Sequence, residues 1–148
     1  MRYAHTNIIA GNWKKLAQFY IEVFNCEPTY PERDLFGEWI DKATNINNVR
    51  IRGIHLRLPG YTDGPTLEIF QYERDKARNI PPEIDMPGLG HIAFEVESIE
   101  QIQVKLLAHG GTKLGDIVKR ELEGVGILTM VYSRDPEGNI VEIQNWQK

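Results

Sequence analysis

Hydrophobic and polar positions follow the same pattern near the start and in the middle of the chain. In residues 88–96 apolar and polar side chains alternate as in a β-strand, which places His91 on the face opposite Phe94. Residues 3–10 show a similar strand pattern and carry His5 in the equivalent place. The pattern therefore predicts two strands, each with a histidine on the face turned away from its packed side.

Each predicted strand is followed by a segment with helical periodicity. Asn12 is a suitable N-cap for the first helix, and Ser98 with Gln101 matches a capping box at the start of the second. The second helix is expected to stop at Gly110-Gly111. The positions expected to face the core are Trp13, Leu16, Ala17, Tyr20 and Val23 or Phe24 in the first helix, and Ile99, Ile102, Leu106 and Leu107 in the second.

Three further strands are predicted in each half. In the first half, Pro28 and Pro31 limit the strand near residues 27–33 to a short or edge strand, and Gly53 suggests a bulge in the next one. Residues 36–48 are irregular, with a helical turn expected at 37–43 and a loop at 45–48. The remaining predicted strands are 49–58 and 66–72 in the first half, and 113–123, 126–133 and 139–146 in the second.

The order strand, helix and three strands thus occurs twice, which indicates a duplicated supersecondary unit. Residues 67–72 and 141–146 both read aliphatic, Glu, Ile, two residues, aromatic. We predict an α+β protein with one βαβββ module in residues 1–73 and a second in 88–148. The charged and proline-containing residues 74–87 are the predicted linker.

Composition narrows the possible partners. The chain has 148 residues, a net charge of -4 and no basic stripe, so neither nucleic acid nor a membrane surface is an expected partner. It shows no apolar run long enough to span a bilayer and no signal-peptide pattern after Met1, and we expect a cytoplasmic protein. The single Cys26 is interpreted as a packing residue rather than a nucleophile.

Four residues carry the candidate chemistry: His5, Glu68, His91 and Glu142. Each lies on the face of its predicted strand that is opposite the apolar face, and the two halves use equivalent positions. A lone histidine or glutamate on a strand is ordinarily hydrogen-bonded or solvated, but the repetition of both favours a shared ligand set. Two imidazoles and two carboxylates suit one divalent ion, whether Zn, Ni, Co, Mn or Fe.

An octahedral ion with these four ligands keeps two positions for two oxygens of a small-molecule substrate. The other two histidines, His55 and His109, are interpreted as structural. No nucleotide-binding or nucleophile motif occurs in a suitable context.

At these residues the chain resembles the vicinal oxygen chelate superfamily, also called the glyoxalase, bleomycin resistance and dioxygenase fold. The resemblance implies two βαβββ modules that form a curved mixed sheet, or half-barrel, around a metal cleft, with ligands on the first and last strands of each module. It also makes a homodimer the expected assembly, because a half-barrel leaves apolar surface to bury. The segments that carry the resemblance are His5, Phe19-Tyr20, 67–69, 90–94 and 135–143.

Within this superfamily the full His-Glu-His-Glu set is similar to bacterial glyoxalase I, whereas methylmalonyl-CoA epimerase typically has Gln at the position of Glu68. The resemblance therefore implies a lyase, isomerase or epimerase that abstracts a proton next to a carbonyl through a metal-bound enediolate, with Glu142 or Glu68 as the base. Two alternatives stay open: an extradiol-type dioxygenase, which would prefer one protein ligand fewer, and a non-catalytic protein that binds a small molecule such as an antibiotic.

Overall fold

A computed structural model describes residues 1–74 and 80–147, and it divides the chain into two compact units. Unit 1 comprises residues 1–78 and unit 2 comprises residues 79–148, and each unit is described by itself. The predicted linker, residues 74–87, includes residues 75–79, which lie outside the described residues.

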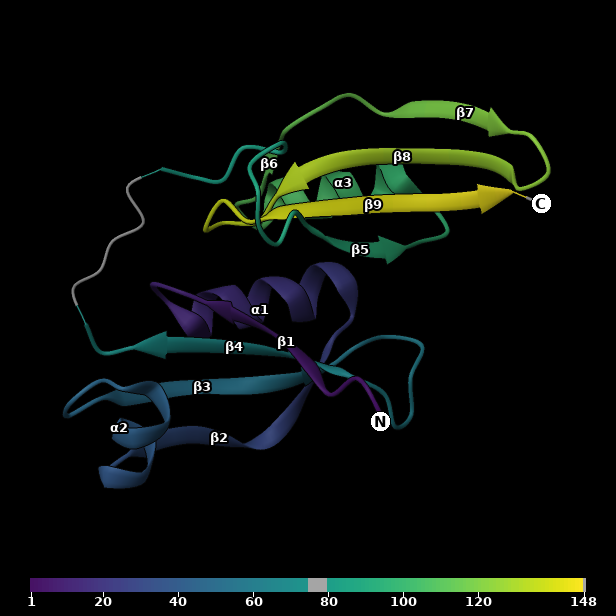
Figure 1. The fold of residues 1–148 in the computed structure, drawn as a ribbon. Helices are drawn as coiled ribbons and strands as arrows, with labels where there is room; N and C mark the ends of the chain where they lie inside the picture. The colour runs from purple at the N-terminus through teal and green to yellow at the C-terminus, as the bar shows by residue number, and fades with distance from the viewer. Residues whose placement is uncertain (75–79, 148) are drawn as a thin grey trace. The chain divides into compact units, whose positions relative to one another are not determined.

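Unit 1 is a four-stranded mixed sheet with two helices. Its strands follow the order β1-β4-β3-β2, in which β1 runs parallel to β4 and the other neighbours are antiparallel (Figure 1). Its elements are β1 (His5–Ile9), α1 (Trp13–Phe24), β2 (Glu27–Phe36), α2 (Glu38–Thr44), β3 (Arg50–Arg57) and β4 (Thr66–Tyr72).

Unit 2 repeats this arrangement. Its strands follow the order β5-β9-β8-β6, β5 is parallel to β9, and β7 also pairs with β8. The predicted α+β class with two βαβββ modules is therefore confirmed. The elements of unit 2 are β5 (Ile92–Glu95), α3 (Ile99–Ala108), β6 (Thr112–Lys113), β7 (Val118–Leu122), β8 (Gly126–Arg134) and β9 (Ile140–Gln147).

Both helix starts follow the sequence prediction. The side chain of Asn12 accepts a hydrogen bond from the backbone N–H of Lys15 (3.1 Å), and Ser98 Oγ accepts one from the N–H of Gln101 (3.3 Å). The predicted apolar stripe of α1 is buried, with Phe19 in addition. In α3 the prediction for Leu107 is wrong, because this side chain is exposed and Gln103 is buried in its helix. No helix in residues 1–74 or 80–147 is long and apolar enough to cross a membrane.

β2 extends over ten residues and is the edge strand of the sheet, which is one of the two alternatives that its prolines predicted. Two other strand predictions are wrong. The bulge lies in β2 between Thr29 and Arg33 rather than at Gly53 of β3. The predicted strand at residues 113–123 is divided into β6 and β7, which pair with different parts of β8.

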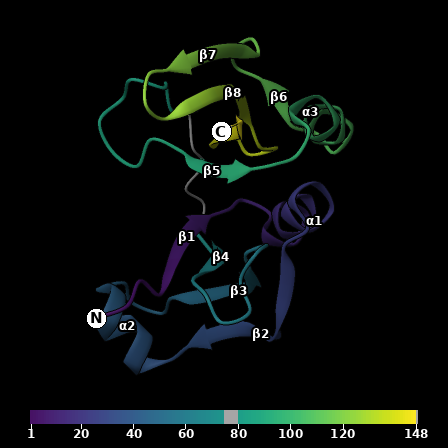
Figure 2. The same cartoon turned by 90° about the vertical axis from the view of Figure 1, so that its right-hand side faces the viewer.

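The irregular residues 36–48 build a second apolar layer on unit 1. The buried side chain of Ile40 in α2 packs with Ile51 of β3 and Phe70 of β4, whereas Leu67 and Ile69 of β4 are buried on the other face. Figure 2 shows α1 and α2 on opposite sides of this sheet. Apolar layers on both faces explain why the hydrophobic alternation of β3 changes parity near Gly53.

Gly53 of β3 allows a close approach to β4, and we expect Gly53→Ala to be strongly destabilising. A Cβ atom there would fall inside the contact distance of the Ile69 carbonyl oxygen and 2.9 Å from Phe70 Cα, and these backbone atoms cannot move aside cheaply. The free energy of unfolding should fall by about 3 kcal/mol, measured by urea denaturation. Gly115→Ala is the matched control, since an added Cβ there meets no atom within 4 Å. Equal stability of the two variants would contradict the prediction that a Cβ atom at residue 53 collides with β4.

Candidate functional site

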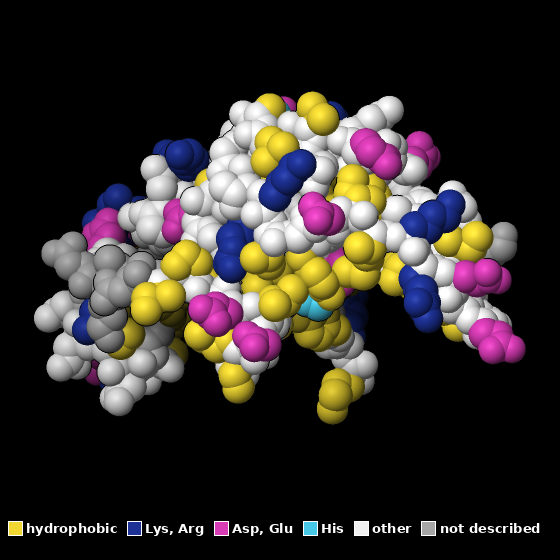
Figure 3. All heavy atoms as spheres, turned by 90° about the horizontal axis from the view of Figure 1, so that it is seen from above, with side chains coloured by type: hydrophobic (Ala, Val, Ile, Leu, Met, Phe, Trp, Pro, Cys, Tyr) yellow, Lys and Arg dark blue, Asp and Glu magenta, His cyan; other side chains and the backbone are white. Residues whose placement is uncertain are grey.

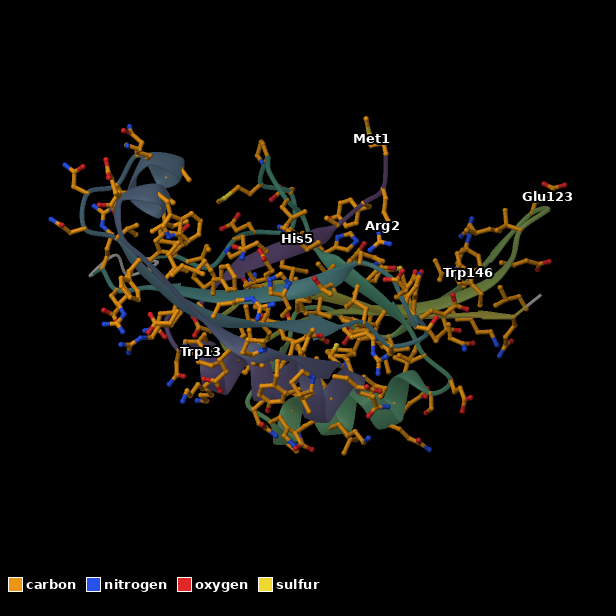
Figure 4. The ribbon with its side chains drawn as sticks, turned by 90° about the horizontal axis from the view of Figure 1, so that it is seen from below. Met1, Arg2, His5, Trp13, Glu123 and Trp146 are labelled. Carbon is orange, nitrogen blue, oxygen red and sulfur yellow. The ribbon has the colours of Figure 1, made fainter. Side chains whose placement is uncertain are left out.

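The face of the unit 1 sheet opposite α1 carries a row of polar side chains. Strand pairing places Asn7 of β1 directly beside Glu68 of β4, and His55 of β3 directly beside Glu68 on its other side. His5 precedes Asn7 by two residues, so it points to the same face. Figure 4 shows His5 on β1, with Trp13 at the beginning of α1 on the other side of the sheet.

Glu68 is the centre of this group. His5 Nε2 lies 3.2 Å from Glu68 Oε2, and Asn7 Nδ2 donates a hydrogen bond to the same oxygen at 3.0 Å. His55 Nε2 lies 2.7 Å from Glu68 Oε1, and its other ring nitrogen lies 3.0 Å from Thr66 Oγ1. Both oxygens of the carboxylate are therefore held by side chains of the same sheet.

The environment of His55 favours its neutral form. Burial lowers the pKa of His55 below its ordinary value, the charge of Glu68 opposes this effect, and the positive charge of Arg33 adds to it. A neutral ring has one N–H, and the carboxylate of Glu68 accepts hydrogen bonds only. His55 therefore donates from Nε2 to Glu68.

Unit 2 contains a second histidine–glutamate pair. His91 Nε2 lies 2.9 Å from Glu142 Oε2, and the His91 ring packs edge-on against Tyr132 with a centroid separation of 5.2 Å. Tyr132 of β8 lies directly beside Glu142 of β9. Burial, the charge of Glu142 and a hydrogen bond to this carboxylate raise the pKa of Tyr132 above its usual value. The phenol therefore stays protonated near neutral pH and donates to Glu142.

The two pairs occupy equivalent positions in the two sheets. Asn7 pairs with Glu68, and Ala93 pairs with Glu142 in the same parallel arrangement. In each unit the histidine, His5 or His91, precedes the strand partner of the glutamate by two residues. The remaining equivalent neighbours are His55 and Tyr132 beside the glutamate, and Thr66 and Ile140 two residues before it.

The donor atoms of both pairs fit a divalent ion. Imidazole nitrogen and carboxylate oxygen are common ligands, and two such ligands bound at about 2.1 Å to one ion lie roughly 3 Å apart. The Nε2–Oε2 distances of 3.2 Å and 2.9 Å match this spacing. The carboxylate side chains are 11% and 12% exposed, whereas those of the histidines are 43% and 34% exposed. Each pair thus has a largely buried oxygen donor and a more accessible nitrogen donor.

Neither unit gathers, within its described residues, three His, Cys, Asp or Glu side chains that could hold a metal ion on their own. The side chains around Glu68 are instead a hydrogen-bonded group centred on one carboxylate. The structure therefore brings together His5 with Glu68 and His91 with Glu142. The meeting of both pairs at one ion stays a prediction.

Sequence reasoning missed three side chains that contact the glutamates: Asn7, His55 and Tyr132. Asn7 could have been found, because it follows His5 by two residues and shares its face. His55 and Tyr132 required the pairing register of β3 with β4 and of β8 with β9, which the sequence does not specify directly.

Comparison with known proteins shows the family of this chain. The family model of the Glyoxalase/Bleomycin resistance protein/Dioxygenase superfamily matches residues 2–143. The chain belongs to this superfamily. No curated protein sequence matches it.

Solved structures of superfamily members share the fold. A glyoxalase family protein from Bacillus cereus has a TM-score of 0.85 and 17% identity, with 100% of this chain and 95% of that chain covered. A domain from Frankia sp. EAN1pec has a TM-score of 0.65 and 17% identity, covering 99% and 98%. A protein from Enterococcus faecalis has a TM-score of 0.58 and 24% identity, covering 97% and 95%. At these identities the likeness shows the fold alone.

Proposed function

We propose that this superfamily member is a metal-dependent enzyme that moves a proton next to a carbonyl group, as a lyase, isomerase or epimerase does. The observation that carries the proposal is the histidine–glutamate pair found in the same register in both units, 3.2 Å apart in unit 1 and 2.9 Å in unit 2. In this proposal His5, Glu68, His91 and Glu142 supply four ligands to one divalent ion, either Zn, Ni, Co, Mn or Fe.

A bound ion would supply Lewis-acid polarisation of the substrate's carbonyl oxygen. The chain itself would supply the proton-transfer group, and the contacts favour Glu142 over Glu68 for this role. Side chains hold both oxygens of Glu68, including the amide of Asn7, whereas Ala93 in the equivalent position beside Glu142 has no polar group. Glu142 is therefore the carboxylate with more freedom to move toward a substrate.

The phenol of Tyr132 has a supporting role in this proposal. It lies beside Glu142, donates to its carboxylate and remains protonated near neutral pH. It can therefore stabilise the ionised form of Glu142 before a proton is taken. The substrate class that fits is a small molecule with two oxygens positioned to chelate the ion.

Metal content of the untagged protein tests the proposal directly. We expect about one equivalent of a divalent transition metal per chain after reconstitution, measured by elemental analysis. His5→Ala and His91→Ala should each weaken metal binding more than about 100-fold, because each removes a ligand. His109→Ala is the matched control, since the described hydrogen bond of the His109 side chain joins its Nδ1 to the carbonyl oxygen of Lys105 near the end of α3.

Two outcomes would contradict the proposal. A wild-type protein that retains no metal above the level of a metal-free control has no such centre. Unchanged metal binding in His91→Ala would show that His91 of unit 2 is not a ligand of the ion.

Oxygen uptake with a catechol, dependent on iron, would favour the dioxygenase alternative, and tight ligand binding without turnover would favour a binding protein.

The homodimer remains a prediction from the superfamily. Figure 3 shows hydrophobic side chains gathered in the middle of the face in view. Such apolar surface is of the kind that association would cover. Large exposed apolar side chains of unit 2 include Ile84, Met86, Leu89, Ile117, Val118 and Val125.

A further inference from the structure

His55 occupies the strand position directly beside Glu68, where it contacts one of the two carboxylate oxygens. Its Nε2 lies 2.7 Å from Glu68 Oε1, while His5 and Asn7 face the other oxygen, Oε2. The two oxygens of Glu68 thus have separate partners. A rotation of the carboxylate would break the contact with His55 and the contacts at Oε2 together.

The His55 ring is itself fixed at both nitrogens. A carboxylate only accepts hydrogen bonds, so Nε2 carries the proton that is shared with Glu68 whatever the charge of the ring. Nδ1 lies 3.0 Å from Thr66 Oγ1, and the ring also packs edge-on against Phe70 at a centroid separation of 5.8 Å. A flipped ring would lose its distinct partners on both sides.

In unit 2 the positions equivalent to His55, Thr66 and Asn7 carry different side chains. Tyr132 replaces His55 beside the glutamate, Ile140 replaces Thr66, and Ala93 replaces Asn7. Alanine and isoleucine side chains have no hydrogen-bonding group, so the polar framework around Glu142 is smaller. The two modules therefore hold equivalent glutamates with different rigidity.

We propose that His55, oriented by Thr66, is a positioning residue that fixes the carboxylate of Glu68 and leaves Oε2 as the oxygen presented beside His5. The part of this inference that concerns a bound cation rests on the proposed function. The part that concerns the orientation of His55 and Glu68 does not, because it follows from contacts within unit 1. In this arrangement Glu68 stays bound to the ion throughout turnover, and Glu142 is the carboxylate that moves.

Substitutions at residue 55 can separate the contact with Glu68 from the contact with Thr66. In His55→Gln the amide nitrogen can reach the former position of Nε2 and donate to Glu68. In His55→Asn the shorter amide reaches only the former position of Nδ1, next to Thr66. His55→Phe keeps a ring of similar size against Phe70 and removes both hydrogen bonds.

The first measurement is the affinity for Co²⁺ or Zn²⁺, determined by competition with a chelator. We expect His55→Asn and His55→Phe to bind about 10- to 100-fold more weakly, the range for loss of a partner of a metal ligand, and His55→Gln to stay within about threefold of wild type. Thermal unfolding of each variant checks that the fold is retained. Equal affinity in all three variants, or equal loss in all three, would overturn the positioning role.

The second measurement uses metal-free protein and does not depend on the proposed function. Nitrogen-15 chemical shifts of the imidazoles report which nitrogen carries the proton, and we expect Nε2 of His55 to be protonated. A neutral ring protonated at Nδ1 would overturn the inference. Should wild-type protein bind no metal, the proposed function fails, while the nitrogen shifts still decide the orientation of His55 toward Glu68.

Discussion

Glu142→Gln should abolish most turnover and leave the fold intact. The replacement keeps the size of the side chain and its ability to contact His91 and Tyr132, but an amide cannot accept a proton from carbon. General base catalysis typically contributes about 10²- to 10⁴-fold, so we expect a loss in this range. The measurement is turnover of methylmalonyl-CoA, or of the hemithioacetal of glutathione and methylglyoxal, by metal-loaded protein.

Glu68→Gln is the matched comparison for this experiment. His55 and Asn7 hold Glu68 in place, and glutamine occurs at this position in epimerases that the chain resembles. We therefore expect Glu68→Gln to retain more activity than Glu142→Gln. Undiminished turnover in Glu142→Gln would remove Glu142 from the reaction, and a larger loss in Glu68→Gln would reverse the assignment of the two carboxylates.

Cys26 should be about a thousandfold less ionised in the folded protein than in the unfolded chain. The side chain is 2% exposed, and burial raises the pKa of its thiol from 9.0 to about 12. At pH 8 the thiolate is then about 10⁻¹ of the population when unfolded and about 10⁻⁴ when folded, and only the thiolate reacts with electrophiles. Labelling by iodoacetamide should be slower by at least this factor in native buffer than in guanidinium.

The interpretation of this experiment is simple because Cys26 is the only cysteine. Rapid labelling of native protein would show that the thiol is accessible and would make a role as a nucleophile possible.

The raised pKa of Cys26 also has a consequence for stability. The folded state keeps its proton above pH 9, where the unfolded thiol loses it, so the contribution of this residue declines as the pH rises from 9 toward 12.

The sequence predicted well those features that depend on residues close together in the chain. The caps at Asn12 and Ser98 act over three residues, and the alternation of β4 spans the strand exactly at residues 66–72. The position of Glu68 on the polar face followed from that alternation. The repetition of the whole pattern then located Glu142 without knowledge of the fold.

Features that depend on pairing between distant strands were predicted less well. The length of β2 depends on its edge position, and the second apolar layer depends on α2 covering β3 and β4 near Phe70. The contact of His55 with Glu68 joins residues from two strands whose register is set by this packing. A local pattern could not show that His55 belongs to the candidate site.

The parallel pairing of β1 with β4 affects how unit 1 can be assembled during synthesis. β1 is the first strand of unit 1 to be synthesised, yet its hydrogen-bonding partner β4 is the last strand of the unit. The contact between His5 and Glu68 closes a loop of about sixty residues, so its entropic cost is met only when the rest of the unit has begun to fold. Half of the candidate centre is therefore completed late, which couples maturation of the ligand pair to cooperative folding of the whole unit.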